Sequence, residues 1–248
     1  MIDIDLKDRI VLITGGCSGA GKGIAEQFLK SGAEVLVTYN RSLPDSKEVK
    51  AYKYDQGDFD SIRRLVEDVI RDHGRIDMLV NNAGIYPASS LDTMSEEDYD
   101  AMFDINTKGV FFLSKEFARY MGNGSIINIS SINATNPASK LIHYGMSKAA
   151  IEMATRCLAY ELGPKIRVNC IAPGLIYKEG QERFIPGWRE SYCERSALKR
   201  LVYPEDIGNT AIFLASDLSS AITGQIITVD CGVSLAPYFY NHVEDEHV

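Results

Sequence analysis

The chain has 248 residues, a formal net charge of −8 at pH 7, and hydrophobic and charged fractions of 45% and 24%. These fractions are those of an ordinary globular protein, and the length suits one large α/β domain better than two small ones. The negative charge argues against a nucleic-acid partner, because phosphate binding needs a basic face.

Short apolar runs alternate with longer helical patterns along the whole chain. We expect strands at Ile10–Thr14, Glu34–Thr38, Ala51–Tyr54, Met78–Val80, Ser125–Ser130, Ile166–Cys170 and Ile226–Val229. We expect helices at Gly21–Lys30, Phe59–Asp72, Glu96–Tyr120, Ser147–Leu162 and Pro204–Leu214. The strands are almost entirely apolar, which indicates burial on both faces, as in a parallel sheet. The alternation predicts a single α/β domain over residues 1–248, a Rossmann-type doubly wound parallel sheet of about seven strands.

Three segments depart from this alternation. The connection over residues 40–50 is too short for a full helix, so we expect an abbreviated crossover there. Residues 175–203 form a long stretch rich in aromatic and charged residues, with Pro186 and Gly187 inside it. Long irregular segments in compact domains are commonly lids or binding loops, so we expect a substrate-loop insertion. The acidic tail at 238–248 is expected to be peripheral.

The cysteines and the amino-terminal residues bear on the compartment. The five cysteines are scattered without a CxxC pair, which argues against a disulfide framework or a metal site and suits a reducing compartment. The first residues lack the positive charge of a signal peptide, and no apolar run approaches the roughly 18 residues of a spanning helix. We therefore expect a cytoplasmic protein with no membrane partner.

A glycine-rich turn, Thr14-Gly15-Gly16-Cys17-Ser18-Gly19-Ala20-Gly21, follows the first predicted strand and leads into a helix. Its glycines let the backbone approach a pyrophosphate, which would face the free N–H groups and positive end of the helix. A simple tight turn is the alternative, but the strand before it and the helix after it favour nucleotide binding. The candidate cofactor contacts are Gly15, Cys17, Ser18, Gly19 and Ala20.

The TGxxxGxG spacing of this turn resembles the glycine motif of the short-chain dehydrogenase/reductase family. Three further segments resemble family motifs. Residues Asn81-Asn82-Ala83-Gly84 match NNAG, and Tyr144-Gly-Met-Ser-Lys148 match YxxxK. The segment from Asn169 through Gly174 matches NxxxPG. The resemblance extends from about Lys7 to Leu235. It implies an oxidoreductase that interconverts a carbonyl and an alcohol with a nicotinamide cofactor, assembled as a homotetramer or homodimer. The implied cofactor contacts include Asn82, Ala83, Gly84, Pro173, Gly174 and Ile176.

Tyr144 and Lys148 stand four residues apart at the start of a predicted helix, so their side chains share a face. A phenol with a pKa near ~10 is a poor base at neutral pH, and a nearby ammonium would lower that pKa. This tuning suits a general acid and base, although a solvated surface pair is the alternative.

Two further residues complete the predicted catalytic set. Ser131, just past the fifth strand, could donate to the substrate oxygen, with Ser130 as the competing candidate; family spacing implies Ser131. Asn106 matches a family asparagine that helps organise a water-linked proton path to the lysine. A hydrogen-bonded core residue is the alternative for Asn106.

The cofactor preference is predicted from the residues after the second strand. No acidic residue of the kind that marks NAD(H) stands there, and Asn40, Arg41 and Ser42 follow Tyr39. Arg41 and Ser42 could meet the 2′-phosphate of NADP(H), which is preferred, but an exposed loop arginine is the alternative and NAD(H) is also possible. Asp55 and Gln56 resemble the family's adenine contacts.

Two positions depart from the family pattern: Lys178 stands where a threonine often contacts the nicotinamide, and Cys231 replaces a glycine of VDGG. Both departures bear on the placement of the nicotinamide.

The substrate is predicted least closely. We expect a small-molecule carbonyl or alcohol with apolar or ring surface, in a pocket lined by Tyr86, Asn133, His143, Phe184, Trp188 and Tyr192 beside Ser131 and Tyr144. Sugar, polyol, steroid and cyclic-ketone dehydrogenases are candidate activities. A 3-oxoacyl thioester reductase is disfavoured, because an acidic carrier protein would want a basic rim and the segment from Arg119 to Gly124 offers little. A catalytically silent nucleotide-binding sensor or interaction protein is the alternative outside enzymes.

Overall fold

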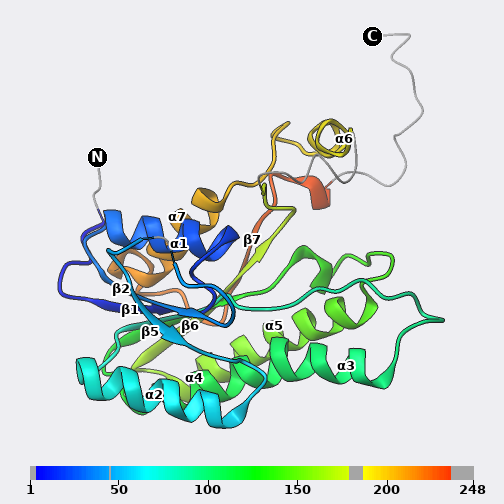
Figure 1. Cartoon of the computed structure of the whole chain (residues 1–248). Helices are drawn as coiled ribbons and strands as arrows, with labels where there is room; N and C mark the ends of the chain where they lie inside the picture. The colour runs from blue at the N-terminus through cyan, green and yellow to red at the C-terminus, as the bar shows by residue number, and fades with distance from the viewer. Residues whose placement is uncertain (1–3, 45, 179–186, 236–248) are drawn as a thin grey trace, which may run out of the picture.

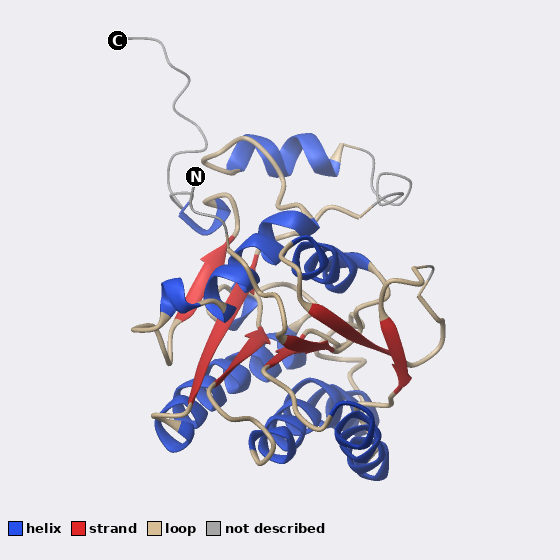
Figure 2. Ribbon diagram, turned by 90° about the vertical axis from the view of Figure 1, so that its left-hand side faces the viewer, coloured by secondary structure: helices blue, strands red, loops and turns tan. Residues whose placement is uncertain are grey.

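A computed structural model describes residues 4–44, 46–178 and 187–235 of the chain. One sheet of seven parallel strands lies between two layers of helices (Figures 1 and 2), and its strand order is β3-β2-β1-β4-β5-β6-β7. The strands are β1 (Ile10–Ile13), β2 (Glu34–Tyr39), β3 (Lys50–Lys53), β4 (Met78–Asn81), β5 (Gly124–Ile129), β6 (Ile166–Pro173) and β7 (Ile226–Val229). The main helices are α1 (Gly19–Lys30), α2 (Phe59–His73), α3 (Glu96–Phe103), α4 (Val110–Ala118), α5 (Ile142–Leu162), α6 (Trp188–Arg195) and α7 (Pro204–Ala215). The predicted doubly wound fold is confirmed.

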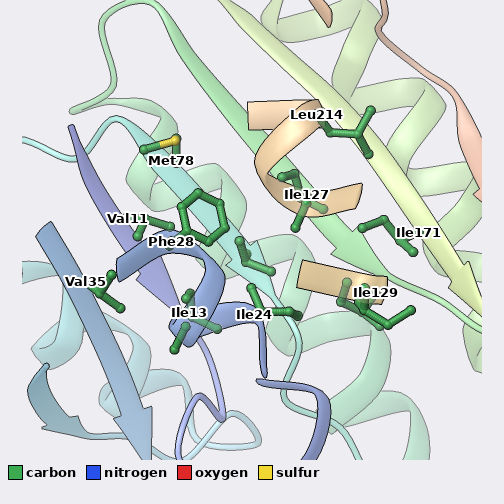
Figure 3. Close-up of a cluster of buried hydrophobic side chains, with 14 of the residues drawn as sticks. Val11, Ile13, Ile24, Phe28, Val35, Met78, Ile127, Ile129, Ile171 and Leu214 are labelled. Carbon is green, nitrogen blue, oxygen red and sulfur yellow. The ribbon is translucent and has the colours of Figure 1, made fainter. Parts of the chain in front are cut away.

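The two faces of the sheet bury alternate residues of the central strands. Val11 and Ile13 of β1 face α1 and α7 in a cluster that includes Phe28 and Leu214 (Figure 3). Ile10 and Leu12 belong to the opposite cluster, together with side chains of α2, α4 and α5. All four β1 residues are therefore buried, which explains why the strand is apolar without alternation.

The carboxyl edge of the sheet contains the point where the strand order reverses. β1 pairs in parallel with β2 on one side and with β4 on the other. The chain therefore leaves β3 at one edge of the sheet and returns to the centre through α2. Ligands of open α/β sheets bind beyond the carboxyl ends of the strands at such a reversal.

The helix predicted over Glu96–Tyr120 is wrong as a single element. The structure has α3, then a π-helical turn at Asp104–Gly109, then α4. Gly109 in this turn packs against the Gln56 backbone so closely that a Cβ would overlap the Gln56 carbonyl oxygen. Asn106 in the same turn is hydrogen-bonded to the backbone of Ile85, in the loop after β4. The π-helical turn, which holds one residue more than an α-helical turn, thus contacts segments that are distant in the sequence. Such π-bulges are frequent at functional sites.

Two other boundaries differ from the predictions. α5 begins at Ile142, five residues before the predicted start at Ser147, and its N-cap Leu141 makes no side-chain capping bond. The predicted loop at 175–203 contains the helix α6, which the sequence did not indicate because its eight residues show no apolar periodicity. Residues 179–186 of this segment and the acidic tail at 238–248 lie outside the described residues. No helix in the described part of the chain is long and apolar enough to cross a membrane.

Candidate active site

The glycine-rich turn leaves the start of α1 accessible, with Ser18 and Gly19 exposed. Gly15 and Gly19 have φ values of 64° and 53°, a region that favours glycine. A Cβ at Gly15 would lie 3.2 Å from the Ala83 Cα, whereas a Cβ at Gly19 would meet nothing within 4 Å. Ser18, the N-cap of α1, makes no side-chain bond to the helix. The N–H groups of the first turn therefore face open space, which suits an anion such as a diphosphate.

Thr14 fastens this turn to the loop after β4. Its Oγ1 accepts hydrogen bonds from the backbone N–H of Asn82 at 3.0 Å and of Ala83 at 2.9 Å. The Asn82 amide returns bonds to the carbonyl oxygens of Thr14 at 2.8 Å and Gly15 at 3.3 Å. The glycine turn and the predicted contacts Asn82, Ala83 and Gly84 are thereby brought together. The sequence prediction did not single out Thr14, although it directly precedes Gly15.

The end of β2 lies beside the glycine turn. The Thr38 hydroxyl accepts from the Gly15 N–H at 3.1 Å, and the Cys17 thiol donates to the Thr38 carbonyl at 3.5 Å. Asn40, Arg41 and Ser42, which follow, are exposed. The geometry therefore places the predicted 2′-phosphate residues next to the turn.

Gln56 is buried between the loop after β4 and the π-helical turn. It is 5% exposed, and its amide donates to the carbonyl oxygens of Ala83 at 3.0 Å and Ile105 at 2.7 Å. These bonds hold the β4 loop against the π-helical turn, and the contact of Gln56 with the adenine stays a prediction. Asp55 is exposed beside it and accepts from the Gly57 N–H at 3.0 Å.

Ser131 and Tyr144 come together through the end of β5 and the first turn of α5. The hydroxyl of Ser131 lies near enough to the phenol of Tyr144 to counteract part of the rise in the pKa of that phenol. Ser130 points elsewhere: its hydroxyl donates to the Lys148 carbonyl at 3.2 Å and to Oε1 of Glu152 at 3.1 Å. The geometry thus selects Ser131 over Ser130 as the serine beside the tyrosine.

Lys148 lies under the same ring. Its Nζ is 5.7 Å from the centroid of Tyr144, and it donates to the carbonyl oxygen of Ile129 at 2.8 Å. The side chain is 5% exposed, and burial lowers the pKa of Lys148 to about 8. Burial raises the pKa of Tyr144, and the nearby hydroxyl of Ser131 opposes that rise. Desolvation of the phenol therefore sets the direction of this pKa shift, and a lowering of the tyrosine pKa by Lys148 stays a prediction.

Asn106 is a buried connector beside the lysine. Its Oδ1 accepts from the Ile85 N–H at 2.9 Å, and its Nδ2 donates to the Ile85 carbonyl at 2.8 Å and to the Ser147 hydroxyl at 3.2 Å. A Cβ placed at Gly84 would lie 3.0 Å from Asn106 Oδ1 and 3.6 Å from Lys148 Nζ. The residue is thus a hydrogen-bonded core residue that also fixes the backbone next to the lysine.

The carboxyl end of β6 contributes Pro173, Gly174 and, three residues after the strand, Ile176. A Cβ at Gly174 would lie 2.6 Å from the Tyr192 hydroxyl and 2.9 Å from the Asp230 Cβ, so this position requires glycine. Ile176 forms a parallel bridge with Val202, which closes the base of the 175–203 excursion. Lys178, at the departure from the family pattern, is exposed.

Three of the predicted substrate residues, Tyr86, Asn133 and Trp188, are at least partly exposed. Tyr86 is 64% exposed, and its ring meets the Tyr144 ring edge-on with centroids 6.2 Å apart. Asn133 is half-buried, and its N–H donates to Ser131 Oγ at 3.1 Å. Trp188 begins α6, and its indole N–H finds no partner among the described residues.

Two of the predicted substrate contacts, His143 and Tyr192, are buried. His143 is fully buried at 0% exposure, which is incompatible with the predicted direct contact to substrate. Tyr192 is 8% exposed, and its hydroxyl accepts from the Leu175 N–H at 2.9 Å, so it anchors the loop and does not line an open pocket. Phe184 lies outside the described residues.

The fold and site define a class: an α/β protein whose carboxyl edge joins a dinucleotide-type glycine turn to a Ser–Tyr–Lys constellation. A family model described as Enoyl-(Acyl carrier protein) reductase matches residues 15–234. The chain is 39% identical over 244 residues to a 3-oxoacyl-[acyl-carrier-protein] reductase of Thermotoga maritima, covering 92% of this chain and 98% of the relative. It is 35% identical over 249 residues to a probable galactose dehydrogenase of Rhizobium meliloti, covering 92% and 96%.

Solved structures agree with these relatives. The ligand-free aldohexose dehydrogenase of Thermoplasma acidophilum matches with a TM-score of 0.91 at 26% identity, covering 98% of this chain and 100% of that one. A glucose/ribitol dehydrogenase from Brucella melitensis matches with a TM-score of 0.87 at 32% identity, covering 94% and 99%. The chain belongs to the short-chain dehydrogenase/reductase family and is an NAD(P)-dependent oxidoreductase.

Proposed function

We propose that this enzyme interconverts a carbonyl and a secondary alcohol, prefers NADP(H) over NAD(H), and uses Tyr144 to exchange the proton. The observation that carries the proposal is the convergence of Ser131, Tyr144 and Lys148 at the sheet edge that also bears the glycine turn.

The residues present fit a dinucleotide. The open surface at Gly19 and the free first turn of α1 would hold the diphosphate, with Arg41 and Ser42 at a 2′-phosphate. Asp55, Gly84 and the backbone from Pro173 to Ile176 would line the rest of the site, and Lys148 would hold the nicotinamide ribose. When bound, the nicotinamide supplies or accepts the hydride.

The protein's own groups handle the oxygen and its proton. In reduction, Tyr144 donates its phenolic proton to the carbonyl oxygen, and Ser131 orients both that oxygen and the phenol through its hydroxyl. Lys148, with a pKa of about 8, sits where it can lose or regain a proton close to neutral pH. Asn106 acts through the backbone of Ile85 and keeps Gly84 next to the lysine.

The surroundings of Tyr144 favour a compact ring-shaped or hydroxylated substrate over an acyl thioester on a carrier protein. The exposed ring of Tyr86 beside Tyr144 offers a face for C–H groups, and its hydroxyl can pair with a polar substituent. Arg119, at the end of α4, is already paired with Glu116 at 2.9 Å and adds no free basic rim for an acidic carrier. Sugar dehydrogenases among the relatives and neighbours are consistent with this choice.

A panel assay tests the proposal. NADP⁺ and NAD⁺ reduction would be followed with aldohexoses, polyols and cyclic alcohols, and NADPH oxidation with cyclic ketones and 3-oxoacyl thioesters. We expect turnover with a cyclic or sugar substrate and a higher kcat/KM with the phosphorylated cofactor. Turnover on thioesters alone would overturn the substrate assignment. Cofactor binding without turnover on any member would favour the nucleotide-binding sensor.

A further inference from the structure

A buried carboxyl group lies next to the candidate site and has no part in the proposed reaction. Glu152 is on α5, one turn after Lys148, and is 7% exposed. Burial raises the pKa of Glu152, while the hydrogen bond from Ser130 and the charge of Arg156 oppose that rise. Burying a carboxyl group costs free energy, and an apolar side chain of similar size would avoid this cost. Packing alone therefore does not explain a glutamate at this position.

Ser130 connects this carboxyl group to the end of β5. Its hydroxyl donates to Oε1 of Glu152 at 3.1 Å and to the carbonyl oxygen of Lys148 at 3.2 Å. Its backbone N–H donates to the carbonyl oxygen of Ile171 in β6 at 2.8 Å. A hydroxyl has one proton to share between its two acceptors, and a bond to a carboxylate is the stronger kind. Glu152 is therefore the main tie between Ser130 and α5.

The same stretch of chain positions two groups of the candidate site. The Ser130 N–H and the Ile129 carbonyl belong to one planar peptide unit, and that carbonyl accepts from Nζ of Lys148 at 2.8 Å. Ser131 follows directly, and its hydroxyl lies near the phenol of Tyr144. A shift of Ser130 would therefore displace the acceptor of the Lys148 ammonium and the hydroxyl of Ser131 together.

We propose that Glu152 is a positioning residue that, through Ser130, holds the end of β5 against α5. It thereby keeps Nζ of Lys148 and the hydroxyl of Ser131 at their places in the candidate site. This role rests on the proposed function, in which those two groups act beside Tyr144. No proton or hydride passes through Glu152, so its contribution is to geometry alone.

The pKa of Lys148 reports on this arrangement without any turnover. Burial lowers it to about 8, so loosening the end of β5 would admit water and return it toward 10.5. The other titratable groups around Lys148 and Glu152 are Tyr144 and Arg156 on α5 and Cys170 on β6. Burial raises the pKa of Tyr144 and raises that of Cys170 to about 12, so both are still neutral where the lysine begins to titrate.

Three variants of the full-length protein test the role. Glu152→Met removes the carboxyl group at similar size, Glu152→Gln keeps an acceptor oxygen, and Thr155→Val is the matched control. Thr155 is buried on the same helix, but its hydroxyl accepts from Asn128 and donates to the carbonyl oxygen of Ile151. The measurements are kcat, KM and the Kd for NADPH, together with the free energy of unfolding at a series of pH values from neutral to 10.5.

We expect Glu152→Met to lower kcat about tenfold while KM and Kd stay within about threefold, because misplaced groups slow the reaction without weakening binding. In the wild type the stability begins to rise near pH 8, and in Glu152→Met this rise should begin at a higher pH. Glu152→Gln should recover most of kcat and the wild-type pH dependence. Thr155→Val should lower the stability and change neither kcat nor the pH at which the rise begins.

A wild-type kcat or a wild-type pH dependence in Glu152→Met would overturn the positioning role. So would a kcat in Glu152→Gln or in Thr155→Val as low as that in Glu152→Met. If Glu152→Met does not fold, Glu152→Asp takes its place, because its carboxylate is withdrawn by one methylene and should give the same changes more weakly. A lack of turnover on every substrate of the panel would contradict the proposed reaction instead, and the pH dependence of unfolding would still decide the role of Glu152.

Discussion

The ammonium group of Lys148 is buried, and burying this charge lowers the stability of the folded protein. The pKa of its ammonium falls from the ordinary 10.5 to about 8 through burial. Between these two pH values the unfolded chain holds a proton that the folded chain has released, so stability rises with pH across this window. Below pH 8 both states are protonated, and the folded state bears the full cost of the buried charge.

Lys148→Met tests this balance. At pH 7 the variant should be more stable than the wild type by roughly 1–2 kcal/mol, after allowing for the lost bond to the Ile129 carbonyl. The difference should shrink as pH rises from 8 to 10.5, because the wild-type lysine then becomes neutral in both states. Denaturant unfolding at several pH values measures it. A stability difference that does not vary with pH would contradict the buried charge.

Ser130 and Ser131 are adjacent, but the structure assigns them opposite tasks. Ser131→Ala should lower kcat on the order of 10²-fold, because it removes a hydroxyl from the reacting centre, and should cost stability only through the lost cap on the Asn133 N–H at 3.1 Å. Ser130→Ala should cost about 1–2 kcal/mol of stability, because the buried Glu152 carboxylate loses its donor at 3.1 Å. The measurements are kcat and the free energy of unfolding for both variants. A larger loss of kcat in Ser130→Ala than in Ser131→Ala would reverse the assignment.

At the scale of elements, α1 and α7 approach closely at Gly23. A Cβ at Gly23 would lie 2.8 Å from the Pro204 carbonyl carbon and 2.9 Å from its oxygen. Gly23→Ala should therefore destabilise the protein by about 1–3 kcal/mol, although alanine is the better helix former. Gly122→Ala is the control, since a Cβ there meets nothing within 4 Å and φ is not positive. Thermal unfolding of the pair measures the contrast, and equal melting temperatures would refute the close approach.

The strands and their parallel arrangement could be predicted from the sequence because the central strands are buried on both faces, so apolar runs mark them. The π-helical turn could not, because its contacts to Gln56 and Ile85 join residues far apart in the sequence. The start of α5 at Ile142 carries no capping signal. The misses thus have two causes: distant contacts shape the π-helical turn, and the start of α5 and the helix α6 lack a local signal.

The candidate site divides in the same way. Spacing along one helix located Tyr144 and Lys148, and Ser131 lies near the phenol while its role stays a prediction. Periodicity could not reveal that the side chain of His143 turns into the interior while its neighbour Tyr144 reaches the site. The direction of the Tyr144 pKa shift also depends on burial, which a motif does not encode.

At the scale of the whole molecule, α5 presents an apolar face that a lone chain leaves exposed. Met146, Met153 and Tyr160 on this helix are 46%, 56% and 87% exposed, and Phe111 on α4 is 39% exposed. We propose that this face is covered in a homotetramer or homodimer, since exposed apolar patches commonly mark interfaces.

Sedimentation velocity tests the assembly. The wild type should sediment as an oligomer, and a Met153→Glu, Tyr160→Glu double variant should shift toward monomer because charges are costly at an apolar interface. Leu91→Glu changes another exposed leucine, at 77% exposure in the loop before α3, and should leave the assembly intact. An unchanged sedimentation coefficient in the double variant would exclude this face.

The central claim is that Tyr144 exchanges the proton in a reaction that the rest of the site only positions. The most direct measurement compares wild type and Tyr144→Phe in NADPH binding by cofactor fluorescence and in turnover on the best substrate of the panel. Removing only the phenolic oxygen should leave the Kd for NADPH within about threefold while turnover falls on the order of 10³-fold. Undiminished turnover in Tyr144→Phe would contradict the account, as would a wild-type protein that binds neither NADPH nor NADH.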